Sequence, residues 1–386
     1  MHTKKKLIRI TTVPYSLGGL LRGQLRFMNQ YYDVIGISSS YDGYLDHVGD
    51  REHIRVIAVE MTRKITIFKD LSAVWKLYRI FRSEKPFMVH THTPKAGTVG
   101  MMAAYLARVP NRLHTIAGLP LMEATGFKRK VLDAVEKMTY GCASMIYPNS
   151  FGLQQVILTN GYTTAKKLKV IGKGSSNGID TSHFDPARHT EAELAALRKS
   201  LSIKPEDFVF IFVGRLVRDK GINELVAAFD QLSKKHPNIK LLMLGFYERE
   251  LDPLDDETNT NIETNRDIVY AGSHEDVRPF MALSDLLTFP SYREGFPNVV
   301  MEAGSMGLPC IVSDINGCNE IVVNGQNGVI VPVKSETALM QAMEELLLDR
   351  KKRMELAKNA RPMIQNRFER SYIWEELLKE YKSFDK

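Results

Sequence analysis

The sequence is poor in cysteine and has no long apolar run, and each absence excludes a class of protein. Its three cysteines among 386 residues are an odd number and form no Cys-x-x-Cys pair, which excludes a disulfide scaffold and predicts a reducing, cytoplasmic setting. No run of about 18 apolar residues occurs, and the apolar stretch behind the basic start is too short for a signal peptide. Any membrane contact is therefore expected to be peripheral, at the cytoplasmic face of the inner membrane.

Motifs for metals and for nucleic acids are also missing. The sequence contains no Asp-x-Asp motif and no pair of histidines spaced to share one helix face, so it predicts no metal site. It has no zinc-finger spacing, no basic-region heptads and no aromatic ribonucleoprotein motif. We therefore expect no nucleic-acid partner.

Charge is divided unevenly along the chain. Residues 1–185 hold 26 Lys and Arg against 13 Asp and Glu, a net charge of +13, whereas residues 186–386 hold 26 against 32, a net charge of −6. A basic half predicts an anionic partner, either a phosphorylated small molecule or an anionic membrane. The basic run Lys128-Arg-Lys130 stands beside an amphipathic stretch and fits a membrane surface, although it fits a solvated helix face almost as well.

Short apolar runs alternate with longer stretches of helical spacing in two successive series. The first series predicts strands at Leu7–Val13, Val34–Ile37, Ile54–Val59, Phe87–His90, Arg112–Ile116 and Ser144–Tyr147. The second predicts strands at Phe208–Val213, Ile239–Leu244, Ile268–Tyr270, Leu286–Phe289, Ile311–Val312 and Val329–Val331. Helices are expected between most of these strands, including one at Leu20–Asn29 and a charged, amphipathic tail from Lys351 to Phe384.

This alternation is typical of parallel sheets covered by helices, so the predicted fold class is α/β. The glycine-rich stretch Gly172–Gly178 separates the two series. We expect two Rossmann-like, doubly wound domains that face each other across a cleft, at residues 1–178 and 179–368. A chain of 386 residues also favours two domains over one.

The segment Gly214-Arg-Leu-Val-Arg-Asp-Lys220-Gly221 directly follows a predicted strand. Ligands of doubly wound sheets bind beyond the carboxyl ends of the strands, so Arg215 and Lys220 are expected at a ligand-binding edge. Two fixed cations there can hydrogen-bond a diphosphate and stabilise the charge that builds as a nucleoside diphosphate leaves. The alternative is a solvated loop with two surface charges.

The segment Glu294-Gly-Phe-Pro-Asn-Val-Val-Met-Glu302 also follows a strand, and it opens a helix at Pro297. Gly295 lets the backbone approach a ligand, and the free amides from Asn298 onward can face phosphate or sugar oxygens. We expect Glu302 about two turns into the helix, with a rise of roughly 12 Å from Glu294 if both residues are helical. That separation is too large for the two carboxylates of a hydrolase, and it suits one carboxylate that contacts the sugar and another that contacts the ribose. The alternative is that a Glu near a helix start only caps the helix.

Together these segments resemble the glycosyltransferases of family 4, which have the GT-B architecture and retain anomeric configuration. The family's E-x7-E signature matches Glu294 and Glu302, its G-R-x4-K matches Gly214 to Lys220, and its S-N-G-I-D matches Ser176 to Asp180. The resemblance implies that Glu294 contacts the donor sugar, Glu302 the ribose, and Arg215 with Lys220 the diphosphate.

The resemblance also implies that the final helix, within residues 369–386, packs back onto the N-terminal domain. No cofactor is expected beyond a nucleotide sugar, a UDP-sugar carrying a hexose or N-acetylhexosamine, and no metal is required. The donor-binding residues predicted on this basis are Gly18, Gly19, Arg215, Lys220, Glu294, Gly295, Phe296, Asn298, Val299 and Glu302.

The N-terminal half supplies candidates for the acceptor side. Gly18 and Gly19 follow the first strand and are expected to open the first helix, where they can admit a phosphate or an acceptor, or serve only a steric need. The segment His90-Thr-His92-Thr-Pro-Lys95 resembles one found in bacterial polysaccharide transferases of this family. It makes His92 and Lys95 candidate acceptor contacts.

One departure from the family pattern concerns a histidine. Many members carry T-x-H-G near the donor sugar, but this chain has Thr115-Ile-Ala117-Gly118. His114 cannot substitute, because an odd offset on a strand points its side chain to the opposite face. Glu123 is a nearby carboxylate that can orient or deprotonate the acceptor hydroxyl as a catalytic residue, or be an ordinary surface glutamate.

The predicted function is transfer of a sugar from a UDP-sugar to a glycan or polyprenyl-diphosphate-linked saccharide in envelope or capsular polysaccharide biosynthesis. Two alternatives stay open at this point: a UDP-sugar 2-epimerase of GT-B architecture and a non-catalytic nucleotide-binding module. An epimerase needs acid and base carboxylates close to one sugar carbon, and the sequence does not supply an obvious pair.

Overall fold

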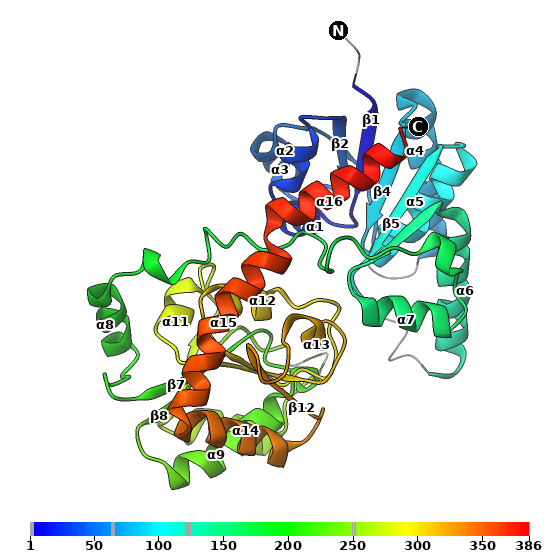
Figure 1. Cartoon of the computed structure of the whole chain (residues 1–386). Coiled ribbons are helices and arrows are strands. Elements are labelled where there is room, and N and C mark those ends of the chain that lie inside the picture. The colour runs from blue at the N-terminus through cyan, green and yellow to red at the C-terminus, as the bar shows by residue number, and fades with distance from the viewer. Residues whose placement is uncertain (1–3, 63–65, 120–124, 249, 251, 386) are drawn as a thin grey trace. The chain divides into compact units, whose positions relative to one another are not determined.

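The computed structural model describes residues 4–62, 66–119, 125–248, 250 and 252–385. The chain divides into two compact units (Figure 1). The first consists of Met1–Gly178 and Arg370–Lys386, and the second of Ile179–Glu369. The division falls at the end of the glycine-rich stretch and again near the C-terminus.

The first unit is built on a six-stranded parallel sheet with the order β3-β2-β1-β4-β5-β6. Its strands are β1 (Lys6–Ile10), β2 (Asp33–Ser38), β3 (Arg55–Ala58), β4 (Met88–His92), β5 (Asn111–Ile116) and β6 (Met145–Pro148). Its helices are α1 (Pro14–Leu20), α2 (Gln24–Met28), α3 (Tyr44–Glu52), α4 (Ile67–Glu84), α5 (Pro94–Leu106), α6 (Gly126–Cys142), α7 (Phe151–Thr159) and α16 (Arg370–Ser383).

The second unit repeats this plan with the strand order β12-β11-β10-β7-β8-β9. Its strands are β7 (Phe208–Val213), β8 (Ile239–Leu244), β9 (Ile268–Gly272), β10 (Leu286–Phe289), β11 (Cys310–Ser313) and β12 (Gly328–Val331). Its helices are α8 (Glu191–Ser200), α9 (Ile222–Lys235), α10 (Asp256–Thr264), α11 (Arg278–Ala282), α12 (Asn298–Ser305), α13 (Cys318–Ile321), α14 (Glu336–Leu348) and α15 (Arg350–Phe368).

The central strands of both sheets are buried on both faces, which explains why β7 and β8 are largely apolar runs without alternation. The strands β1, β4 and β5 also bury polar residues, among them Arg9, His90 and His114. In the first unit, side chains on the two sides of the sheet enter separate apolar clusters, one around Ile8, Ile10 and Val89 and the other around Leu7 and Val34. The predicted α/β class with two Rossmann-like domains is confirmed.

Several helix predictions were wrong in detail. The helix expected at Leu20–Asn29 is only the short α2, because Leu20 ends α1 and Gly23 takes a left-handed conformation (φ 77°) between the two helices. The expected tail helix is two helices, α15 and α16, which belong to different units. Helix α10 went unpredicted because only Thr258 and Ile262 of its nine residues are buried, which leaves little apolar periodicity.

Helix α16 completes the core of the first unit. Its residues Leu377, Leu378 and Tyr381 join the apolar cluster on one face of the sheet. The Tyr381 hydroxyl lies 2.5 Å from Nδ1 of the buried His90 on β4. The first unit therefore depends on residues from both ends of the chain.

Replacing Tyr381 with alanine should lower the free energy of unfolding by about 3 to 5 kcal/mol, since it empties a fully buried site. Tyr381→Phe should cost only about 1 to 3 kcal/mol, because it removes the hydroxyl that pairs with His90 and keeps the ring. Urea unfolding monitored by circular dichroism measures both changes. The exposed Lys379→Ala on the same helix is the control, and equal losses in Lys379→Ala and Tyr381→Ala would contradict the prediction.

Candidate functional site

In the second unit, the loop after β7 contacts the loop after β10. Gly214 follows β7, Arg215 comes next, and a single 3-10 turn (Arg218–Lys220) leads to Gly221 at the start of α9. Gly221 has a left-handed backbone (φ 69°), and a Cβ there would overlap the carbonyl oxygen of Pro290. Only glycine allows the two loops to approach this closely.

This approach brings the predicted donor-binding side chains together. The Lys220 ammonium forms an ion pair with the Glu294 carboxylate, and both side chains are largely buried. The hydroxyl of the buried Ser291 donates to Oε1 of Glu294 at 3.0 Å. The more exposed Arg215 pairs with Glu248, which follows β8. The structure thus gathers Arg215, Lys220 and Glu294 at the carboxyl ends of neighbouring strands.

A third loop, after β11, supports the backbone at Glu294. The Asn316 amide donates to the carbonyl oxygens of Glu294 and Gly295, at 3.2 Å and 2.8 Å. Gly317 has a positive φ (78°), and a Cβ there would lie 2.5 Å from the Gly295 carbonyl oxygen and 2.9 Å from Phe296 Cα, so glycine allows this loop to approach the Glu294 loop. The sequence reasoning missed this loop, although an Asn-Gly pair after a strand is a signal for such a turn.

Helix α12 carries Glu302 closer to its start than expected. The helix begins at Asn298, and Glu294 lies outside it, so Glu302 is little more than one turn into the helix rather than two. Burial raises the pKa of the Glu302 carboxyl to about 7. Asn298 is exposed and Val299 is partly buried.

One predicted donor contact, Phe296, can involve only the backbone. The Phe296 side chain is buried in the core of the second unit, with its ring centroid 5.3 Å from that of Phe368. Its aromatic ring is therefore unavailable to a ligand, and only its backbone lies near the Glu294 loop. Gly295, the residue before it, is partly exposed.

The glycine pair of the first unit also differs from expectation. Helix α1 begins at Pro14, so Gly18 and Gly19 lie in its last turn and do not open it. Gly18 packs against α3, where a Cβ would meet Val48 at 2.8 Å, and its carbonyl accepts from Arg51 at 2.7 Å. Gly18 is therefore a packing residue. No atom lies within 4 Å of the Cβ position at Gly19, where ligand contact stays a prediction.

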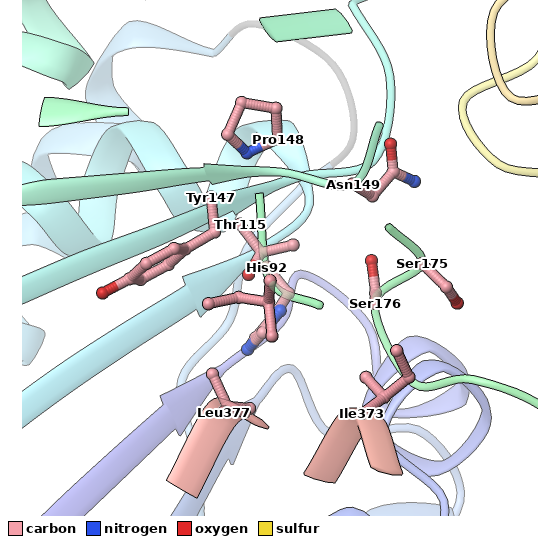
Figure 2. Close-up of a pocket in the computed structure, with 10 residues that line it drawn as sticks. His92, Thr115, Tyr147, Pro148, Asn149, Ser175, Ser176, Ile373 and Leu377 are labelled. Atoms are coloured by element: carbon pink, nitrogen blue, oxygen red, sulfur yellow. The ribbon is translucent and has the colours of Figure 1, made fainter. Parts of the chain in front are cut away.

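A pocket of the first unit lies at the carboxyl ends of β4, β5 and β6, and Figure 2 shows its side chains. Its lining residues are His92, Thr115, Tyr147, Pro148, Asn149, Ile171, Ser175, Ser176, Ile373 and Leu377. Buried oxygens of Asn149 (Oδ1) and Ser176 (Oγ) have no hydrogen-bond partner among the residues that the structure describes. The pocket therefore offers polar groups that a ligand or water can satisfy.

His92 is held in one protonation state by the buried Arg9. Arg9 Nε donates to Nε2 of His92 at 3.1 Å, so the ring proton lies on Nδ1. Burial and the Arg9 charge lower the pKa of His92 well below its usual value. Lys95 is arranged differently, because its ammonium pairs with Asp70 of α4 at 2.5 Å.

Three further residues considered in the sequence are His114, Ala117 and Glu123. His114 is buried against Gly97 of α5, with Nδ1 2.9 Å from the Thr91 hydroxyl. Ala117 is exposed just after β5. Glu123 lies outside the described residues, so its catalytic role stays a prediction.

The described parts of the chain contain no candidate for a metal-binding cluster or a membrane-spanning helix. Across these residues, no group of three or more His, Cys, Asp and Glu side chains is arranged to hold a metal ion. Likewise, none of the helices resolved within the described ranges is both long and apolar enough to cross a membrane.

Comparison with known proteins identifies the family. Residues 22–150 match the family model "Glycosyl transferase 4-like", and residues 195–363 match "Glycosyl transferases group 1". The chain is 35% identical to the capsular polysaccharide biosynthesis glycosyltransferase CapM of Staphylococcus aureus, over 98% of this chain and 97% of that protein. The chain belongs to glycosyltransferase family 4.

Other relatives agree with this family 4 assignment. An Escherichia coli relative, named UDP-Gal:alpha-D-GlcNAc-diphosphoundecaprenol alpha-1,3-galactosyltransferase, is 29% identical over 95% of this chain and 94% of its own length. The crystal structure of Anabaena HepE in complex with UDP superposes with a TM-score of 0.79 at 21% identity, covering 98% of this chain and all of that chain. The fold is GT-B, and the protein is a transferase rather than an epimerase or a non-catalytic module.

The close approach at Gly221 gives a test of this family 4 site. Gly221→Ala should destabilise the protein by about 2 to 4 kcal/mol, because it combines a left-handed backbone with an overlap at Pro290. Gly272→Ala, with a similar backbone (φ 79°) and open space, should cost about 1 to 2 kcal/mol. Urea unfolding of both variants measures the difference, and equal losses would show that the overlap is relieved without cost.

Proposed function

We propose that this enzyme transfers a sugar, a hexose or N-acetylhexosamine, from a UDP-sugar to a glycan or polyprenyl-diphosphate-linked saccharide in envelope or capsular polysaccharide biosynthesis. The observation that carries the proposal is the convergence of Arg215, Lys220 and Glu294 at the carboxyl edge of the second sheet. Two cations and one carboxylate match a ligand that combines a diphosphate with sugar hydroxyls.

The donor would exchange with the carboxylates that now hold the cations. Diphosphate oxygens would replace Glu248 at Arg215 and share the Lys220 ammonium, which frees Glu294 to accept from sugar hydroxyls. Glu302, at the helix that follows, would accept from the ribose. The E. coli relative named for UDP-Gal and the structural neighbour in complex with UDP support a uridine nucleotide.

Arg215 and Lys220, rather than a metal ion, would stabilise the negative charge that builds on the departing UDP. Each can donate hydrogen bonds to phosphate oxygens, so charge that builds on the diphosphate is met by fixed donors. We further propose retention of anomeric configuration, with the acceptor attacking from the face that UDP leaves. If this step needs no metal ion, the rate of sugar transfer should be unchanged when EDTA is added.

For the acceptor, the pocket of the first unit is the candidate site. His92 would donate through Nδ1–H to an acceptor oxygen, since Nε2 is occupied by Arg9. Its low pKa makes it a hydrogen-bond donor rather than a base near neutral pH. The E. coli relative's name includes a diphosphoundecaprenol acceptor, which supports a lipid-linked substrate for this chain.

Replacing Glu294 with alanine should lower kcat/KM by about 100-fold or more, because it removes a group proposed to contact the donor sugar. Mass spectrometry of UDP release across a panel of UDP-sugars and lipid-linked acceptors measures the effect. The control is Glu345→Ala, an exposed carboxylate of the same unit. An active and normally folded Glu294→Ala enzyme would overturn the site assignment.

The raised pKa of Glu302 predicts a pH-dependent affinity for UDP. Ribose hydroxyls donate to the ionised carboxylate, so a group with a pKa of about 7 must lose its proton when UDP binds. From about pH 6 to pH 8, the Kd for UDP should therefore fall by about tenfold beyond any change due to UDP itself. Calorimetry of the wild type against Glu302→Gln separates the two contributions. The same pH dependence in both proteins would exclude a ribose contact by Glu302.

A further inference from the structure

The outer face of α4 carries large apolar side chains that nothing in the described chain covers. Phe68 is 88% exposed, Trp75 61% and Leu71 56%. Their spacing of three and four residues places them on one side of the helix, opposite the stripe formed by Ala73, Leu77 and Phe81 that packs into the core. A helix on the surface of a soluble domain ordinarily has polar residues on its outer face.

The same helix is positively charged on its exposed side. Its two acidic residues are already neutralised, Asp70 by Lys95 at 2.5 Å and Glu84 by Lys6 and Arg55, each at 2.7 Å. Its basic residues are all exposed, and they are Lys69, Lys76, Arg79, Arg82 and the adjoining Lys85. The apolar side chains therefore lie among cations without competing anions on their own helix.

Helix α6 presents the same combination. Phe127 in its first turn is 83% exposed and is followed by the exposed Lys128 and Lys130, whereas Arg129 between them is paired with Asp133. Helix α5 contacts both α4 and α6, so the three helices form one layer on the sheet (Figure 1).

The topology places these residues near the proposed acceptor pocket. Helix α4 follows β3 and α6 follows β5, so both helices begin at the carboxyl edge of the sheet. Phe68 and Phe127 lie in the first turns of the two helices. His92, at the end of β4, lies at the same edge and lines the pocket. Phe68 and Phe127 therefore lie at the same edge of the sheet as the proposed acceptor pocket.

We propose that this face, defined by Phe68, Leu71, Trp75 and Phe127 with their neighbouring basic residues, binds the surface of an anionic lipid bilayer. The rings would enter the boundary between headgroups and acyl chains, and the Lys and Arg side chains would contact lipid phosphates. A second copy of the chain fits less well, because a two-fold contact would set the same basic residues against each other. The inference deepens the proposed function, since it brings the pocket to the surface in which a polyprenyl-linked acceptor is anchored.

Trp75 is a built-in probe for this face, because the chain has only one other tryptophan, Trp374. On vesicles of phosphatidylcholine with phosphatidylglycerol, the emission of the wild-type protein should shift to shorter wavelength and be quenched by brominated phosphatidylcholine. Trp75→Phe should lack both responses, although Trp374 remains. Vesicles of phosphatidylcholine alone should bind more weakly, and salt should weaken binding to the anionic vesicles without abolishing it.

The decisive variant is Phe68→Ser with Leu71→Ser, which should lower the affinity for anionic vesicles by about tenfold or more. Leu348→Ser is the matched control, because Leu348 is 64% exposed in the other unit. Circular dichroism checks that both variants are folded. Vesicle affinity equal to that of the wild type, or no shift of the wild-type emission on anionic vesicles, would overturn the proposal. So would a wild-type dimer that the double variant converts to a monomer.

The two proposals can fail independently. Transfer to a water-soluble acceptor, measured without lipid, reports on the proposed function alone. An enzyme that transfers sugar but does not bind vesicles would overturn the membrane face only, and one that binds vesicles but transfers nothing would overturn the proposed function only.

Discussion

The constraint on which this protein depends is the burial of two parallel sheets on both faces. Once helices cover a sheet, its interior is mostly apolar, and the polar groups that can meet a ligand gather at the carboxyl ends of the strands and in the loops beyond them. Both units follow this rule. His92 and Asn149 lie at the carboxyl edge of the first sheet, and Arg215 and Glu294 lie at that of the second. The two halves thus offer separate polar surfaces, each supported by its own core.

In the second unit, two features build the proposed donor site. Glycines stand where the loops come closest to one another, and ion pairs balance the charges of the side chains that these loops carry. Gly221 and Gly317 let three loops touch, and this contact brings Lys220 within reach of Glu294. Each cation of the proposed donor site holds a carboxylate, so a diphosphate has to compete with Glu248 and Glu294 for them. Without a ligand, both cations are therefore paired within the protein.

In the first unit, a buried charge determines which neighbouring atoms accept hydrogen bonds. Arg9 is fully buried and donates to His92 and to Gln24, so it decides which nitrogen of His92 carries the proton. Tyr381, from the end of the chain, reaches the neighbouring His90. The exposed apolar and basic face of α4 and α6 begins at the same edge, which links the proposed acceptor pocket to the proposed lipid surface.

The sequence by itself determined the α/β class, the strands and the family, because apolar runs and the spacing of Gly214 to Lys220 and Glu294 to Glu302 are local features. Only the tertiary structure decided which of these side chains meet and which are used in packing. It placed Phe296 in the core, paired Lys95 with Asp70, and brought in Asn316 from a distant loop. These outcomes depend on contacts between helices and loops that are separated in the sequence, and local periodicity carries no information about such contacts.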